Sequence, residues 1–234
     1  MALASLLVDG DARPDAAAIA RLAADGAFSC PHGAADGAGW IELLRDGLTF
    51  DCDGLAPAAA VPVPAIAHWY GMEAGTSGLS ALTLSAGPHL KGAEHLLPVV
   101  RVAAGLLAAL AALPGVRAIA WLPAGCATRA DWFTRAVEPW LAGGPFPALA
   151  LSALDHDPAG TLRSRGLGFL VGAEFVLTGV AQLAPDAAAR IAIRLTDWLV
   201  AHGVPEVPRE VEIEGGTTLW LATAPDGTVE AHRR

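Results

Sequence analysis

A strand, a helix and a second strand follow one another in residues Leu79–Leu122, LSALTLSAGPHLKGAEHLLPVVRVAAGLLAALAALPGVRAIAWL. Apolar and polar residues alternate over Leu79–Ser85, and this period of two predicts a half-buried strand. Glu94–Leu113 is apolar almost all round, which predicts a central helix that ends before Gly115. Val116–Leu122 is a short apolar run between turn residues and predicts a buried strand.

The flanking sequence adds helices and hairpins without a regular alternation of strand and helix. Asp46-Gly47 lies between two apolar runs, which is typical of a β-hairpin. Pro-Asp pairs precede two alanine-rich helices, since proline and aspartate favour the first turn of a helix. The remaining predicted elements are strands at 3–8, 40–44, 48–52, 146–154, 209–214, 217–223 and 228–232, an extended segment at 162–177, and helices at 14–26, 128–142 and 185–203. This order predicts an α+β fold with two layers, in which helices pack on a mixed, mainly antiparallel sheet.

A length of 234 residues suits one globular domain, 1–234. The segment 56–78 contains three prolines and three glycines, which predicts a long irregular connection. It either separates an N-terminal βαββ lobe at 1–55 from a main α+β lobe at 79–234, or it forms an ordered loop that lines a site.

Composition excludes several classes of partner. The net charge of −9 and the lack of a basic cluster argue against binding to nucleic acid or to an anionic membrane surface. Three widely spaced cysteines do not suggest a disulfide framework, and the N-terminal residues do not resemble a signal peptide. Lysine occurs once, and alanine, glycine and proline are abundant, as in GC-rich genomes. We therefore expect a soluble, acidic, cytoplasmic protein of bacterial origin.

His89, Glu94 and His95 are the residues most compatible with a metal site. Imidazole and carboxylate groups are ligands for zinc, but this spacing does not place them on one helix face as known zinc motifs do. The alternative is that His89 lies in a surface turn and Glu94 begins the helix near its positive end. Cys30, His32 and Cys52 offer thiol and imidazole groups as well, but buried thiols are the more common use of such cysteines.

Four residues are candidates for ligand contact. Arg163 and Arg165 lie two apart in an extended segment, so they share a face and suit a carboxylate or phosphate. Local pairing with the nearby aspartates is the favoured alternative. Trp69 and Tyr70 belong to the irregular connection, where aromatic residues form a lid, an interface or a plug over the sheet. Of these, the plug is favoured.

Residues 79–205 resemble the uncharacterised bacterial domain of unknown function 4261 family. The similar features are the strand before His89, the long apolar helix, Ala118-Ile119-Ala120-Trp121, Ala148–Leu151, and the run Ser164–Leu167 that leads to Gly172-Ala173-Glu174, followed by the helix that ends at Gly203. The resemblance implies an α+β fold and supplies no catalytic residues.

No G-x-S-x-G, Walker or G-x-G-x-x-G sequence occurs in the chain, so we expect no cofactor and assign no catalytic residue. The first hypothesis is a non-catalytic binding or protein-interaction module, whose partner is another protein or a second copy. The second is a small metal-dependent hydrolase, which requires His68 and His156 to converge with His89, Glu94 and His95.

Overall fold

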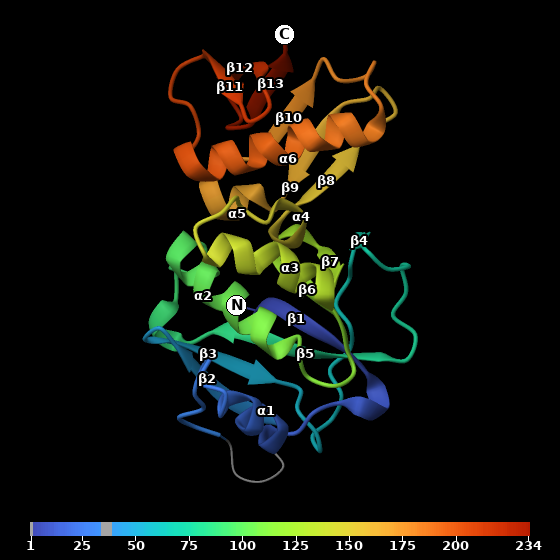
Figure 1. The fold of residues 1–234 in the computed structure, drawn as a ribbon, viewed down its shortest axis with the longest axis vertical. Helices are drawn as coiled ribbons and strands as arrows, with labels where there is room; N and C mark the ends of the chain where they lie inside the picture. The colour runs from blue at the N-terminus through green and yellow to red at the C-terminus, as the bar shows by residue number, and fades with distance from the viewer. Residues whose placement is uncertain (1, 34–38) are drawn as a thin grey trace. The chain divides into compact units, whose positions relative to one another are not determined.

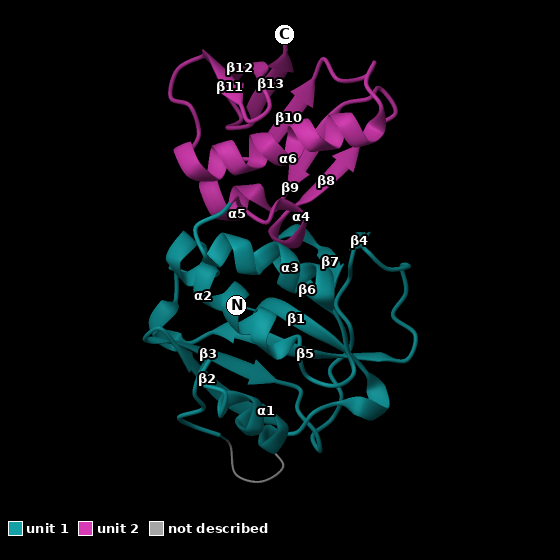
Figure 2. Cartoon of the chain, viewed as in Figure 1, with its two compact units in different colours: residues 1–144 teal, residues 145–234 magenta. Residues whose placement is uncertain are grey.

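The computed structural model describes residues 2–33 and 39–234, and these residues form two compact units (Figures 1 and 2). Unit 1 comprises residues 1–144 and unit 2 comprises residues 145–234. Each unit contains its own mixed, mainly antiparallel sheet with helices packed on it, which confirms the predicted α+β class.

Unit 1 is built on a seven-stranded sheet in the order β2-β3-β5-β1-β6-β7-β4, in which β4 and β7 are parallel and the other pairs antiparallel. Its strands are β1 (Ala2–Asp9), β2 (Trp40–Arg45), β3 (Leu48–Asp53), β4 (His68–Tyr70), β5 (Leu79–Ala86), β6 (Val116–Trp121) and β7 (Cys126–Arg129). Its helices are α1 (Ala16–Ala23), α2 (Leu97–Leu110) and α3 (Ala130–Leu141), with short 3-10 turns at Gly10–Ala12, Pro88–Leu90 and Leu122–Ala124.

The strand β1 lies at the centre of this sheet. It pairs with β5 on one side and with β6 on the other, so that Leu6 lies opposite both Leu82 and Ile119. Residues 3–8 are all buried, since both faces of the central strand are covered. The first strand in the sequence therefore organises the core of unit 1.

Successive strand residues point to opposite faces, so the sheet of unit 1 has two apolar surfaces. Helices α2 and α3 pack against each other, and α3 packs against β6 and β7 (Figure 1). The cluster on the other surface contains Leu7, Ala118 and Ala127 and is covered by Val61, Ile66 and Trp69. The connection at 56–78 is therefore an ordered covering layer, and its middle forms the strand β4.

The predicted hairpin at Asp46-Gly47 is present between β2 and β3. Asp46 has φ 50° and Gly47 has φ 79°, the two positive values that a type I′ turn requires. This turn fixes the register in which Leu43 lies opposite Phe50.

Unit 2 is built on a six-stranded sheet in the order β11-β12-β13-β10-β9-β8, in which β10 and β13 are parallel. Its strands are β8 (Ala153–His156), β9 (Leu162–Arg165), β10 (Phe175–Thr178), β11 (Arg209–Ile213), β12 (Thr217–Thr223) and β13 (Val229–Arg233). Its helices are α4 (Ala148–Leu151), α5 (Leu167–Val171) and α6 (Pro185–His202).

The helix α6 contacts β9 and β11, so the buried residues of the strands, such as Leu177, Leu219 and Ala231, form a core with its apolar stripe. The predicted start at Pro185 and the end before Gly203 are both observed. Side chains of the alternate residues, including Trp220 and His232, point to the opposite face of this sheet.

The short helix α5 is held by a carboxylate that comes from further along the chain. Glu174 accepts hydrogen bonds from the backbone N–H of Leu167 (3.2 Å) and Gly168 (2.9 Å) and from the hydroxyl of Ser164 (2.5 Å). The Ser164 oxygen in turn accepts from the N–H of Phe175 at 2.8 Å. The first turn of α5 is thereby tied to both β9 and β10.

Several predicted elements differ from the observed ones. The helix predicted at Glu94–Leu113 begins at Leu97, because Pro98 occupies the first turn and the preceding residues form turns. The strand predicted at 146–154 is instead α4 followed by β8, and the extended segment at 162–177 contains α5. Short apolar runs do not distinguish a buried strand from a helical turn, which explains both differences.

The units also differ from the lobes considered above. The strands β1 and β3, which lie within 1–55, are hydrogen-bonded to β5 in the same sheet. The boundary between compact units falls after Gly144. Over the residues that the structure describes, no helix combines the length and the apolar character needed to cross a bilayer.

Candidate functional site

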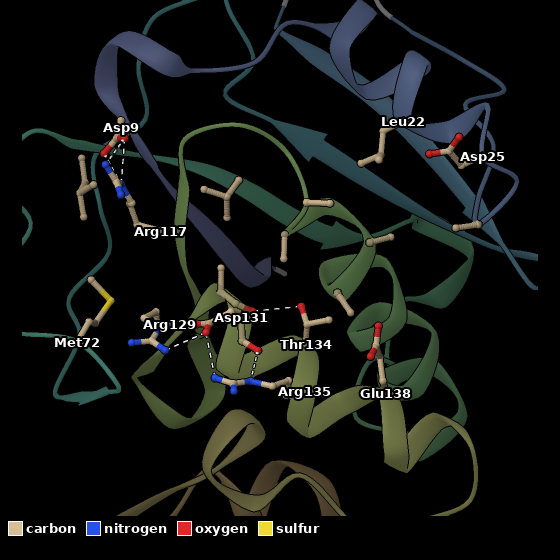
Figure 3. Close-up of a pocket in the computed structure, with 18 of the residues that line it drawn as sticks. Asp9, Leu22, Asp25, Met72, Arg117, Arg129, Asp131, Thr134, Arg135 and Glu138 are labelled. Carbon is tan, nitrogen blue, oxygen red and sulfur yellow. Dashed lines mark hydrogen bonds and ion pairs between the residues drawn. The ribbon is translucent and has the colours of Figure 1, made fainter.

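A broad open cleft of about 1260 Å³ lies in unit 1 (Figure 3). Its walls are formed by the end of α1, the C-terminal end of α2, the exposed side of α3, the segment 72–79, and residues at the ends of β1, β6 and β7. The connection at 56–78 therefore contributes to this cleft, in line with the interpretation of that segment as an ordered loop lining a site.

Small side chains of α2 form the apolar floor of the cleft. Ala108 and Ala109 are half-buried, and Ala112 is exposed at the end of the helix. Leu22 of α1 and Met72 of the connection extend this apolar surface (Figure 3). Because alanine side chains are short and have no rotamers to order, the floor leaves space for the side chains of a ligand.

One wall carries three charged residues of the β7–α3 corner. Arg129 binds both oxygens of Asp131, through Nε at 2.5 Å and through Nη2 at 2.8 Å. Arg135 binds the same carboxylate at 2.9 Å from one turn further along α3. The two guanidinium groups lower the pKa of Asp131, with the hydrogen bond from Arg129 as the largest cause.

A second ion pair joins Asp9, at the end of β1, to Arg117 in β6. The guanidinium Nε donates to the two carboxylate oxygens at 2.9 and 3.0 Å, and this contact raises the pKa of Arg117. Each of the three arginines that line the cleft is therefore held in place by a carboxylate.

Two further carboxylates lie at the other end of the cleft, away from these pairs. Asp25 follows α1, and Glu138 belongs to the last turns of α3 (Figure 3). Neither side chain belongs to any ion pair found among the described residues. Both carboxylates are thus available to a positively charged group in a ligand.

Arg129 also fixes the loop that forms part of the cleft. Its Nη1 donates to the carbonyl oxygen of Gly71 at 3.3 Å, and its guanidinium lies 4.9 Å from the centre of the Trp132 ring. Gly71 has φ 77°, and a Cβ atom there would lie 2.6 Å from the Trp132 ring. A glycine is required at this position, and the loop 71–79 is held against α3.

Helical spacing in the sequence favours Trp132 as a core residue of α3, but the structure contradicts this prediction. The buried residues of α3 are Ala130, Phe133, Val137 and Trp140, whereas Trp132 is 45% exposed. The core stripe passes through positions 133, 137 and 140, so position 132 falls outside it. The ring instead packs over Gly71, and the guanidinium of Arg129 lies over the ring.

The polar side chains that line the cleft carry carboxylate, guanidinium and hydroxyl groups. The hydroxyl of Thr134 donates to the carbonyl oxygen of Ala130, one turn earlier in α3. Preformed ion pairs around an apolar floor can hold the backbone and the charged side chains of a bound segment.

His89, Glu94 and His95 do not assemble into a metal centre in the described residues. His89 is exposed and lies 3.3 Å from the hydroxyl of Thr49. Glu94 and His95 lie in the turns before α2, and no group of three or more ligand side chains that includes them, His68 or His156 occurs in the described residues. Hydrogen bonds from its own N–H and that of Gly92 lower the pKa of Glu94, with its own N–H as the largest cause.

Trp69 and Tyr70 lie in β4, at the edge of the sheet of unit 1. Trp69 is half-buried against the apolar cluster on the face opposite to α2 and α3, which is the plug considered from the sequence. Tyr70 stacks on His68, with 6.4 Å between the ring centres. Neither residue lines the cleft.

Arg163 and Arg165 share the exposed face of β9, as their spacing predicts. Arg165 binds Asp155 of β8 at 3.0 Å, which is the local pairing that the sequence also allowed. Arg163 lines a separate hollow of about 460 Å³ on the sheet of unit 2, together with Trp220 and His232. Arg165 is thus paired locally, whereas Arg163 lines this hollow.

The three cysteines are free thiols. Burial raises the pKa of Cys52 and of Cys126 to about 12, so both stay protonated at neutral pH. Cys30 is half-buried and its pKa is raised by burial as well. His32, which follows it closely in sequence, binds Glu42 at 2.6 Å.

The sequence does not predict the cleft itself, although the spacing of two of its residues favours an ion pair. Asp131 and Arg135 are recognisable as an ion pair four residues apart on a helix. Their combination with Asp9, Arg117 and Glu138 depends on the pairing of strands that are distant in sequence. One signal of the cleft can be found in the sequence. The apolar periodicity weakens at the end of α2, where small side chains occur at Ala108, Ala109, Ala111 and Ala112.

Comparisons of the chain with family models, with curated proteins and with solved structures find no match. The resemblance to the domain of unknown function 4261 family is therefore neither supported nor contradicted by them. The site has to be interpreted from its own geometry.

Proposed function

We propose that the protein is a non-catalytic binding module, and that the cleft in unit 1 receives a segment of a protein partner. The observation that carries this proposal is the alanine floor of α2 between preformed ion pairs on one side and two available carboxylates on the other. Side chains held in place before binding lose little conformational freedom, which favours affinity.

The charges of the cleft select the kind of segment. Asp25 and Glu138 favour a lysine or arginine side chain at one end, where a charge-assisted hydrogen bond is available. The alanine floor favours small or medium apolar side chains beside it. The partner segment is therefore basic and partly apolar, and it belongs either to another protein or to a second copy of this chain.

The proposed setting is the reducing cytoplasm of a bacterium. The three free cysteines and the acidic net charge of −9 support this setting. The same net charge is unfavourable for nucleic acid and anionic membrane surfaces, so a protein partner is preferred.

Selection from a random linear dodecapeptide library displayed on phage tests the proposal with the full chain as bait. A matched pair of variants separates the cleft from the rest of the surface. Ala112→Trp fills the floor at an exposed position, and Ala17→Trp places the same side chain on the exposed face of α1 outside the cleft.

We expect enrichment of peptides rich in lysine and arginine on the wild type and on Ala17→Trp, with loss of at least tenfold on Ala112→Trp. Equal enrichment on both variants would contradict the proposal, as would a lack of enrichment on the wild type. Sedimentation equilibrium identifies a second copy as the partner if Ala112→Trp alone converts an oligomer to a monomer.

A further inference from the structure

The strand β11 (Arg209–Ile213) lies at the end of the sheet of unit 2 and has one neighbour, β12. Along its other edge, no strand and no backbone hydrogen bond from a loop is present among the described residues. Such an edge presents N–H and C=O groups in the spacing of a strand, and an extended segment of another chain can pair with it.

A groove of about 620 Å³ runs beside this edge, between β11, the C-terminal end of α6 and the loop 203–208. Trp198 and His202 of α6 stack at 4.5 Å between ring centres and line the groove. Val207 lines it as well and is 66% exposed, one of the most exposed large apolar side chains in the described residues. The α6 side of the edge therefore offers a partly apolar, aromatic contact surface, on which the guanidinium of Arg209 lies 6.0 Å from the centre of the Trp198 ring.

The side chains of β11 alternate between this apolar side and an acidic side. Val211 is buried toward α6, whereas Glu210 and Glu212 point to the opposite face, where Glu210 lies beside Trp220. Glu206 lines the groove too, and Arg234 binds Glu210 at 3.3 Å. A strand added at this edge would place every second side chain near a glutamate.

The same charges disfavour a second copy of this chain as the added strand. Antiparallel pairing of β11 with itself about Val211 places Glu210 of each strand opposite Glu212 of the other. Directly opposite like charges destabilise a strand pair. A strand with basic residues at alternate positions turns these contacts into attractive ones.

We propose that the outer edge of β11 binds an extended segment of a partner protein in which lysine or arginine alternates with apolar residues. The backbone of this segment continues the sheet of unit 2. Its basic side chains lie beside Glu210 and Glu212, and its apolar side chains enter the groove next to Trp198. This second recognition surface does not depend on the cleft of unit 1.

Fluorescence anisotropy of the full-length protein with a fluorescein-labelled peptide, Lys-Val-Lys-Val-Lys-Val-Lys, tests the proposal. A Glu-Val repeat of the same length tests whether binding depends on the positive charge of the peptide. Two further Lys-Val peptides, one N-methylated at every valine and the other at every lysine, each lose the amide donors on one edge. Glu212→Lys and Glu214→Lys are matched variants, because both glutamates are exposed and only the first lines the groove.

We expect saturable binding of the Lys-Val peptide that weakens with rising salt, and no binding of the Glu-Val peptide. Glu212→Lys weakens binding at least about fivefold more than Glu214→Lys does, because it reverses a cross-strand charge pair. At least one N-methylated peptide loses about tenfold or more in affinity, since it no longer donates to the edge.

Three results would overturn the proposal. The first is the absence of saturable binding at millimolar peptide, and the second is an equal effect of the two charge reversals, which would indicate general electrostatic attraction. The third is full affinity of both N-methylated peptides, which would exclude pairing through the backbone.

Discussion

Replacement of Glu174 tests a part of the structure in which three hydrogen bonds depend on one side chain. Its carboxylate accepts the N–H groups of Leu167 and Gly168 and the hydroxyl of Ser164, at 3.2, 2.9 and 2.5 Å. A hydrogen bond contributes a net of about 0.5–1.5 kcal/mol to stability, so three together are worth about 3 kcal/mol.

We expect Glu174→Ala to lower the free energy of unfolding of unit 2 by about 3 kcal/mol, because it leaves two N–H groups at the start of α5 and one hydroxyl without an acceptor. Glu174→Gln retains one acceptor oxygen and the shape of the side chain. It should cost about half as much, because its amide group faces donors and carries no charge.

Urea unfolding followed by tryptophan fluorescence measures this loss, and hydrogen exchange of the amides of residues 164–175 assigns it to α5. Glu230→Gln is the control, since Glu230 is an exposed glutamate of β13 in the same unit. The reasoning is refuted if Glu174→Ala costs less than about 0.5 kcal/mol, the lower limit for a single hydrogen bond. It is also refuted if the exchange of 164–175 stays unchanged.

Two further predictions concern ionisable groups. The pKa of Asp131 is lowered from its ordinary value of 3.8, so the stability it contributes is present above that pH and is lost as pH falls through the lowered pKa. An NMR titration of the Asp131 carboxyl carbon should give a midpoint below 3.8 that rises in Arg129→Ala, and a wild-type midpoint at or above 3.8 would contradict the geometry. Cys52 and Cys126 are buried and have pKa values of about 12. The thiol reagent dithiobis(nitrobenzoate) should therefore modify at most Cys30 in the native protein, and all three thiols after unfolding. Modification of a second thiol at a rate similar to that of Cys30 would show that Cys52 or Cys126 is accessible to solvent in the native protein.

Local sequence patterns predict a large part of this fold. Asp46-Gly47 identifies the β2–β3 hairpin because few residues adopt two consecutive positive φ values. Pro185 and Gly203 mark the ends of α6 because proline and glycine have restricted roles at helix ends. These features depend on contacts between near neighbours in the chain.

Other features depend on partners that no local pattern reveals. The apolar run of α5 is only five residues long, and such a short run is typical of a strand as well. Its helical form depends on hydrogen bonds to Glu174, which comes later in the chain. Trp132 lies outside the core stripe of α3, and its ring packs on Gly71, which is distant in sequence. The cleft combines α1, α2, α3 and the segment before β5, and the division after Gly144 follows from which strands share a sheet.

The central position of β1 has a consequence for synthesis on the ribosome. Its partners β5 and β6 emerge much later, and Leu6 meets Ile119 only after more than a hundred further residues have been added. At about 5–20 residues per second, the first strand waits on the order of ten seconds with its apolar residues unpaired. The delay in unit 2 is shorter, since Phe175 of β10 pairs with Val229 of β13, 54 residues later. Nascent chains stalled before β6 should therefore be substrates for chaperones, whereas those that extend past β7 should resist protease in unit 1.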